Sequence, residues 1–237
     1  NEGVMGKSIL NWADEFVDLP CQVKDAIARR SIVRTYSNNS VIYLQEDDAK
    51  SIHFVVSGYV RLSYLMEDGT AILYSIVPPG HSFGELAVLD RGRYPDTASA
   101  VGTTQVLSAK PELIGGNYSG HDEVQVALSK LVMKRYRTYI DATKGLFLKT
   151  LQARLALSLL RLVDTLAETT KYCGAQKMCL GPSVNQSDLG AMARGTRGNI
   201  NRILKSWQSN NWIAIERRKI IILDRQSLLD LTYEDQE

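Results

Sequence analysis

The sequence contains no long uninterrupted run of apolar residues. A membrane-spanning helix needs about 18 of them, and no window of the chain approaches this length. Residues 1–10 also have neither a basic start followed by an apolar core nor a small-residue cleavage site. We therefore expect a cytoplasmic protein with no membrane partner. With 44% apolar and 23% charged residues, the 237 residues have the composition of one large or two ordinary globular domains.

Cysteine and histidine are scarce. The cysteines, at positions 21, 173 and 179, are an odd number without CxxC spacing, which argues against a disulfide framework and a zinc ribbon. We expect unconnected thiols, and a redox pair between Cys173 and Cys179 is the alternative. His53, His81 and His121 stand apart from one another, so the sequence offers no metal-ligand set and no placed axial ligand for haem.

Positive charge is nearly balanced overall but concentrated locally. The formal net charge is only +2. Residues 1–120 hold 10 basic and 14 acidic side chains, whereas residues 121–180 hold 10 and 5. Residues 194–219 hold seven basic side chains against one acid, Glu216. Such a local excess is what a surface that contacts phosphates requires.

Residues 32–110 read as short β segments with no helices between them. Ser57-Gly58 and Asp68-Gly69 are predicted turns, since glycine accepts the positive φ of a tight hairpin. Pro78-Pro79-Gly80 breaks the chain again. Many short strands in this arrangement predict an antiparallel barrel or roll. The expected strands include 52–56, 59–65 and 71–77.

Residues 121–150 are free of proline and predict one long helix. Apolar residues recur in it at helical spacing. A helix of this length cannot easily bury its apolar stripe on one small domain, so we expect a dimer seam. The alternative is that the stripe covers the helix's own domain. The stripe consists of Val124, Leu128, Leu131, Tyr139 and Leu146.

The rest of the chain predicts a helix-turn-helix followed by a wing. A helix over 150–167 leads through a loop to two short helices, and a β-hairpin then turns around Glu216-Arg217-Arg218. Small residues, Gly190 and Ala193, would let the two short helices approach each other. The short helices are expected over 186–193 and 196–208, the strands over 212–215 and 219–223, and the shared core from Leu189, Ile200 and Ile203.

The second short helix is the predicted DNA-reading element. Thr196 is placed to cap it and to present first-turn amides to a phosphate. Its polar face carries arginines, whose planar fork pairs with guanine in the major groove. The alternative, a packed helical hairpin with solvated arginines, is disfavoured by the basic wing. The predicted DNA-binding residues are Gln186, Thr196, Arg197, Gly198, Asn199, Asn201, Arg202, Lys205, Arg217, Arg218 and Lys219.

Together these regions resemble the family of the cyclic AMP receptor protein and the fumarate and nitrate reduction regulator. The motifs that carry the resemblance are Val56–Leu62, Pro79–Ala87, Arg154–Leu162, Asp188-Leu189-Gly190, Thr196-Arg197 and Asn199–Lys205. The resemblance implies an α+β fold: an amino-terminal antiparallel β-roll of the cyclic-nucleotide-binding, jelly-roll type, a long dimerisation helix and a carboxy-terminal winged helix-turn-helix. The implied domains are 1–120 with an amino-terminal helical segment, 121–149 and 150–237. The implied partners are double-stranded DNA bearing a roughly palindromic operator, a second copy of the chain and RNA polymerase.

The predicted helix-turn-helix departs from the family in two places. The glutamate that usually follows the first arginine is Gly198 here, so the preferred DNA sequence should differ. The usual turn glycine is Arg194, and Gly195 comes one residue later.

The sensor departs further. In members that bind cyclic nucleotides, a glutamate holds the ribose and an arginine about ten residues on neutralises the phosphate. Glu85 is kept, but Asp96 stands in place of the arginine, so an anion would meet a carboxylate. Tyr139-Ile140 replaces the Thr-Ser pair that the cyclic AMP receptor uses on adenine. The candidate pocket residues are Gly84, Glu85, Leu86, Asp96, Thr97 and Tyr139.

No effector follows from these residues. We expect no cyclic AMP binding in the usual mode, with Arg91 or Arg93 as the alternative phosphate anchors. We also expect no iron–sulfur cluster, because Cys21 is the only cysteine near the amino terminus, and no haem. The effector is therefore unknown and no cofactor is predicted.

Two other classes of function are less compatible with the sequence. A roll that only regulates a partner protein needs no helix-turn-helix and no basic wing. An enzyme would need a catalytic set, but the neighbours His81 and Ser82 would point to opposite faces of a strand. Glu85 and Asp96 as an acid–base pair do not rise above chance. We expect a sequence-specific transcription regulator that is not an enzyme and has no catalytic or metal-binding residues.

Overall fold

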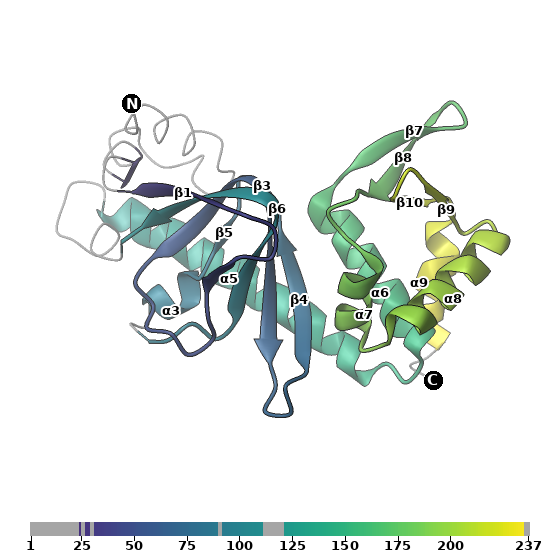
Figure 1. Cartoon of the computed structure of the whole chain (residues 1–237), viewed down its shortest axis with the longest axis horizontal. Coiled ribbons are helices and arrows are strands. Elements are labelled where there is room, and N and C mark those ends of the chain that lie inside the picture. Colours follow the sequence, from purple (N-terminus) through teal and green to yellow (C-terminus); the bar gives the residue numbers. More distant parts are fainter. Residues whose placement is uncertain (1–23, 25–26, 29–30, 90–91, 111–120, 235–237) are drawn as a thin grey trace. The chain divides into compact units, whose positions relative to one another are not determined.

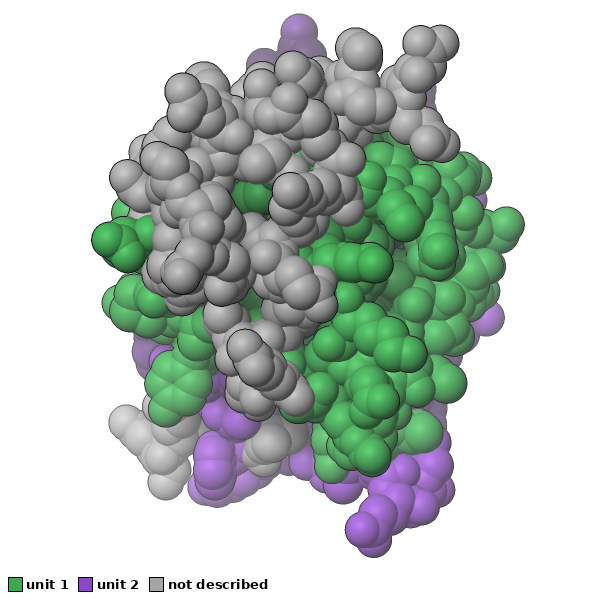
Figure 2. Space-filling view, turned by 90° about the vertical axis from the view of Figure 1, so that its left-hand side faces the viewer, with its two compact units in different colours: residues 1–65, 75–138 green, residues 66–74, 139–237 purple. Residues whose placement is uncertain are grey.

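The computed structural model describes residues 24, 27–28, 31–89, 92–110 and 121–234 (Figure 1). The chain forms two compact units: unit 1 is residues 1–65 with 75–138, and unit 2 is residues 66–74 with 139–237 (Figure 2). The predicted amino-terminal helical segment lies largely outside the described residues. Among the helices that are described, none is long and apolar enough to cross a membrane.

The predicted antiparallel roll is confirmed. Its main sheet has the strand order β1-β6-β3-β4, and β2 pairs with β6 while β5 pairs with β3. Side chains that are at most 1% exposed fill its interior, among them Phe54, Leu62 and Leu107. The strands are β1 (Ile32–Tyr36), β2 (Val41–Tyr43), β3 (Ile52–Leu65), β4 (Ala71–Val77), β5 (Ser82–Phe83) and β6 (Thr97–Ala109).

The predicted turn at Ser57-Gly58 is wrong. β3 runs through it as one strand, and its pairing with β6 shifts register at Ser57, as in a β-bulge. Gly58 has a φ of +78°, and a Cβ there would lie 2.5 Å from Thr104 Oγ1 and 2.7 Å from the Thr103 carbonyl oxygen. The glycine therefore marks a close approach of two strands and not a chain reversal. The turn at Asp68-Gly69 is confirmed, with Gly69 at a φ of +82°.

The roll also contains a helix that the strand pattern did not predict. The short helix α3 (Glu85–Leu89) follows β5 directly. Gly84 precedes it at a φ of +76°, which lets the chain leave the strand and places Glu85 in the first helical turn.

The long helix is confirmed as α5 (His121–Phe147), but its apolar stripe differs from the prediction. Leu131 is only 4% exposed in the single chain, so its assignment to a dimer seam is wrong. The Tyr139 hydroxyl lies 2.9 Å from that of Tyr74 in β4, so Tyr139 also contacts its own chain. The side chains of Val124, Leu128 and Leu146 lie outside the described residues.

A different row of apolar side chains on α5 is exposed. Val126, Met133, Ile140 and Phe147 follow one another at intervals of seven residues, and Tyr136 lies three residues after Met133. They are between 39% and 83% exposed. This is the a/d spacing of a coiled-coil seam. We call these five residues the heptad row.

Unit 2 contains the predicted helix-turn-helix and wing. A four-stranded sheet in the order β7-β8-β10-β9 accompanies the helices. Its β7–β8 hairpin was predicted as a loop, and helix α9 was not predicted. The elements are α6 (Leu151–Leu166), β7 (Thr169–Tyr172), β8 (Ala175–Leu180), α7 (Gln186–Ala193), α8 (Arg197–Ser209), β9 (Ile213–Glu216), β10 (Lys219–Ile222) and α9 (Arg225–Glu234).

The thiols of unit 2 are unconnected. Cys173 lies in the turn of the β7–β8 hairpin and is exposed, whereas Cys179 is buried near the far end of β8. Both are free. Their separation along the hairpin removes the redox-pair alternative.

Candidate DNA-binding surface and sensor site

Helix α7 begins with a complete capping box. The Asn185 side chain accepts hydrogen bonds from the backbone N–H groups of Ser187 and Asp188, at 2.8 and 3.0 Å. The Asp188 carboxylate in turn accepts from the Asn185 N–H at 3.0 Å. These bonds satisfy the orphan donors of the first turn and fix where the helix starts.

The turn between α7 and α8 is built without a glycine at its left-handed position. Arg194 takes that conformation itself, with a φ of +58°. Gly195 serves packing instead, since a Cβ there would lie 2.6 Å from Leu151 Cδ1. A Cβ on Gly190 would lie 2.7 Å from the Gly195 carbonyl oxygen, so the predicted role of Gly190 in close approach is confirmed.

Helix α8 buries one face and exposes the other. Thr196 caps it as predicted, and its hydroxyl accepts from the Asn199 N–H at 3.3 Å. Ile200 is buried as predicted, but Ile203 is only half-buried. Leu204 and Trp207 complete the core in its place. Their spacing of four and seven residues from Ile200 was the signal that could have identified them.

The predicted DNA-contacting residues of α8 spread around its solvent side. Arg197, Gly198, Asn199, Arg202 and Lys205 are exposed. The side-chain nitrogen of Gln186 on α7 lies 3.4 Å from Asn201 Oδ1 and donates to it. Arg202 donates to Asn199 Oδ1 at 3.4 Å. The surface is therefore polar, positively charged and continuous from one helix to the next.

Two hollows flank α8 within unit 2. One has a volume of about 630 Å³ and is lined by Arg197 of α8, Arg218 of the wing, and Gln186 and Ser187 of α7, among others. We call it the wing groove. The other, of about 690 Å³, is lined by Asn199 and Arg202 together with the first residues of α6. Arg197 and Arg202 thus lie on opposite sides of α8, one beside each hollow.

The wing is the hairpin of β9 and β10. Glu216 pairs with Lys219 and closes a loop that consists only of Arg217 and Arg218. Arg217 and Arg218 are exposed, and Lys219 is half-buried, with its Nζ 3.5 Å from Thr170 Oγ1 of β7. The predicted wing residues therefore lie at one tip.

A guanidinium fastens the end of α7 to the start of α6. Arg154 Nε donates to the Ala193 carbonyl oxygen at 2.8 Å, and its Nη1 donates to those of Leu148 and Lys149 at 3.0 and 2.8 Å. Carbonyl groups at helix ends lack intrahelical partners and are stabilised by such donors. Arg154 thereby holds the helix-turn-helix at a fixed position on the α5–α6 junction.

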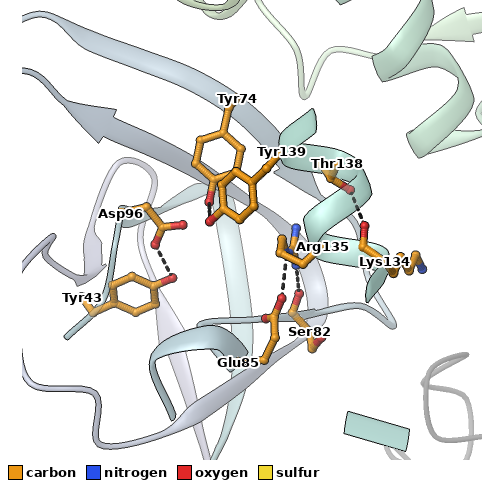
Figure 3. A network of polar contacts seen from close by, with 9 residues as sticks. All are labelled: Tyr43, Tyr74, Ser82, Glu85, Asp96, Lys134, Arg135, Thr138 and Tyr139. Carbon is orange, nitrogen blue, oxygen red and sulfur yellow. Dashed lines mark hydrogen bonds and ion pairs between the residues drawn. The ribbon is translucent and has the colours of Figure 1, made fainter. Parts of the chain in front are cut away.

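In the β-roll, Glu85 is already engaged by the protein's own chain. Arg135 of α5 donates from Nε to Glu85 Oε1 at 2.7 Å and from Nη2 to the Ser82 carbonyl oxygen at 2.6 Å (Figure 3). The side chains are 12% and 1% exposed. Glu85 Oε2 is buried and has no hydrogen-bond partner. The sequence prediction missed Arg135, although it lies one turn after the buried Leu131 and so on the same face of α5.

Asp96 is buried beside a tyrosine. It is 4% exposed, and the Tyr43 hydroxyl donates to its Oδ1 at 2.8 Å (Figure 3). Burial, and then the Asp96 carboxylate, raise the pKa of Tyr43 well above its ordinary value, so the phenol stays protonated as the donor. A buried carboxyl group thus occupies the position that the family resemblance assigns to a phosphate anchor.

The other predicted pocket residues have local roles. Thr97 Oγ1 accepts from the Gln45 N–H at 3.0 Å, and Leu86 is half-buried. A Cβ on Gly84 would lie 3.0 Å from the ring of Tyr94. The alternative anchor Arg93 is 63% exposed and lies 3.7 Å from Asp48, while Arg91 lies outside the described residues.

His53 is a satisfied core histidine. Its Nδ1 lies 2.8 Å from Ser108 Oγ and its Nε2 lies 3.1 Å from the Tyr94 hydroxyl. Burial, with a smaller contribution from the charge of Arg34, lowers the pKa of His53 to about 3. Among the described residues no group of three His, Cys, Asp or Glu side chains is arranged to hold a metal ion.

Two family models match the chain. Residues 33–114 match the cyclic nucleotide-binding domain, and residues 153–231 match the Crp-like helix-turn-helix domain. The chain is 20% identical to the CRP-like cAMP-activated global transcriptional regulator of Mycobacterium tuberculosis, over 81% of this chain and 84% of that protein. It is 25% identical to the transcriptional regulator LdrP of Thermus thermophilus, over 83% and 94%. The solved structure of FixK2 from Bradyrhizobium japonicum superposes with a TM-score of 0.72 at 24% identity, over 85% and 96%.

A β-roll of the cyclic nucleotide-binding type followed by a winged helix-turn-helix defines a DNA-binding transcription regulator. The order of the two domains, their matches and the regulators to which more than four fifths of the chain is similar assign it to a family. The chain belongs to the CRP/FNR family of transcription regulators.

Proposed function

We propose that the chain acts in the cytoplasm as a homodimer that binds a roughly palindromic operator and places α8 of each copy in the major groove. RNA polymerase is the partner expected from the family, and no catalytic activity is assigned. The observation that carries the proposal is the combination of the heptad row on α5 with the exposed basic face of α8.

The heptad row supports self-association. The apolar side chains that repeat every seven residues on α5 are exposed in the single chain. A row of this kind is buried when two such helices pack in parallel, and burial of apolar area is favourable by about 25 cal/mol per Å². Leu131, by contrast, is already buried without a partner.

Two-fold symmetry then determines the form of the operator. A parallel pair of α5 helices relates two copies of α8 by a dyad, so each copy reads one half-site. Half-sites one helical turn apart produce a rough palindrome. Arg197 and Arg202, which lie on opposite borders of α8, can then contact different base pairs of the same half-site.

The sensor contacts argue against cyclic AMP in the usual mode. Arg135 occupies one oxygen of Glu85, and the buried Asp96 would repel a cyclic phosphate. We propose that operator affinity does not change with cyclic AMP. Calorimetric titration of the purified protein with cyclic AMP should give no binding heat, and a saturable signal would contradict this part of the proposal.

The dimer is tested by substituting the heptad row. Met133→Glu places a charge in the seam and should produce monomers in sedimentation, whereas the matched Met133→Leu should remain dimeric. A dimer that persists in Met133→Glu would show that the seam lies elsewhere.

Operator binding is tested by selecting sequences from random duplex DNA with the ligand-free protein. A recovered palindrome, bound with affinities that fall as salt rises from 50 to 200 mM, roughly by the factor expected for several phosphate contacts, would support the proposal. Recovery of only weak and sequence-blind binding would contradict operator recognition by the ligand-free dimer.

A further inference from the structure

The wing turns through two arginines in a backbone conformation that most side chains avoid. Arg217 and Arg218 have φ angles of +47° and +64°. A two-residue loop with both φ angles positive is a type I′ hairpin turn, in which Asn-Gly is the favoured sequence. Two arginines at these positions lower folding stability, and local strain of this kind collects where a function requires it.

Both guanidinium groups are available to a partner. Arg217 and Arg218 are exposed, and neither makes a hydrogen bond or an ion pair with the described part of the chain. The strand that follows them is paired and buried. Ile220 and Ile221 of β10 pair with Leu180 and Cys179 of β8, and Ile221 is 2% exposed. The turn therefore presents two positive charges at the end of a hairpin whose second strand is paired and buried.

The wing tip and helix α8 both border the wing groove, which Arg218 and Arg197 line together. A helix with its side chains is about 10–12 Å wide and fills a major groove about 12 Å wide. The protein surface next to the helix then faces the sugar-phosphate strand that borders this groove. The minor groove begins on the other side of that strand.

We infer that Arg217 and Arg218 insert their side chains into the minor groove that flanks the half-site read by α8, and that they favour A·T base pairs there. The inference rests on the proposed function. The wing groove would seat the intervening sugar-phosphate strand between Arg197 in the major groove and Arg218 in the minor groove.

The dimensions of DNA decide which part of the wing enters. Paired strands are about 4.8 Å apart before their side chains are counted, and the minor groove is only about 6 Å wide. The backbone of the turn therefore remains above the phosphates, and only the guanidinium groups enter. A-tracts narrow the minor groove and strengthen its negative potential, which attracts arginine more strongly than a G·C flank does.

A double substitution separates the side chains from the shape of the turn. Arg217→Asn with Arg218→Gly installs the sequence that a type I′ turn prefers and removes both guanidinium groups, so the thermal midpoint should not fall. The matched control is Arg217→Lys with Arg218→Lys. It keeps both charges for phosphate contacts but replaces the planar, weakly hydrated guanidinium by a strongly hydrated ammonium.

The assay compares one selected operator core carrying either A·T-tract or G·C flanks, at one salt concentration. We expect the unsubstituted protein to prefer the A·T flank about tenfold. The Asn-Gly variant should lose this preference but still discriminate against base changes in the core. The double-lysine variant should keep its affinity for the core and show a reduced preference for the A·T flank. Equal affinity of the unsubstituted protein for both flanks would overturn the inference and leave the proposed function standing. A preference for the A·T flank that survives in the Asn-Gly variant would do the same. Failure to recover any operator would overturn the proposed function as well.

Discussion

The buried ion pair between Arg135 and Glu85 offers the most direct test of how the roll is held together. Arg135→Met keeps most of the apolar stem but removes the guanidinium. The Glu85 carboxylate, 1% exposed, would then lose its charged partner at Oε1, while Oε2 already lacks a hydrogen bond. Leaving one partner of a buried pair uncompensated typically costs about 3–5 kcal/mol.

The measurement is the free energy of unfolding in urea, followed by circular dichroism. Arg135→Met should lower it by about 3–5 kcal/mol, and adding Glu85→Gln to the same chain should recover part of the loss, because a neutral amide is less costly to bury than a carboxylate. Arg93→Met serves as the matched control, since its pair with Asp48 is 3.7 Å long with side chains 63% and 75% exposed. Such a pair contributes about 0–1 kcal/mol. If Arg135→Met costs no more than Arg93→Met, the reasoning about burial is refuted.

Three further outcomes follow from other residues. Because the pKa of His53 is lowered to about 3, the unfolded chain binds a proton that the folded chain does not. The free energy of unfolding should therefore fall by about 2 kcal/mol from pH 7 to pH 5, and an undiminished slope in His53→Gln would assign the effect to another group. Gly198→Ala should raise the thermal midpoint, because a Cβ there meets nothing within 4 Å and alanine favours helix by up to about 1 kcal/mol. The added methyl group should also obstruct the close approach of DNA and weaken operator binding. Unchanged affinity in a binding titration would exclude such an approach. Arg197→Ala should weaken specific binding by about 1–3 kcal/mol and leave the sedimentation of the dimer unaltered, and equal losses on operator and random DNA would make Arg197 a phosphate contact.

Much of the DNA-binding unit was predictable because its signals are local. Thr196 as a cap and Gly190 at the helix crossing depend on neighbours only a few residues away, and both predictions agree with the structure. The hairpin around Arg217 was equally predictable, because apolar runs flank it on both sides.

The contacts within the β-roll were harder to predict because they join distant segments. Arg135 and Glu85 are 50 positions apart, and Tyr43 and Asp96 are 53 apart. Periodicity shows which face of α5 is apolar but not which apolar row faces the roll and which is exposed, and for this reason Leu131 was assigned to the wrong side. The sequence does not distinguish a turn from a bulge at Gly58, because a glycine with positive φ serves either one.

The clamp formed by Arg154 has a consequence for how new binding specificities arise. The Arg154 guanidinium holds the helix-turn-helix through the backbone carbonyl oxygens of Leu148, Lys149 and Ala193. These acceptors are present whatever side chains the neighbouring positions carry. The exposed side chains of α8 take no part in it. Under the proposed function, substitutions at the exposed positions of α8 change the preferred operator and leave the hydrogen bonds between Arg154 and the backbone intact.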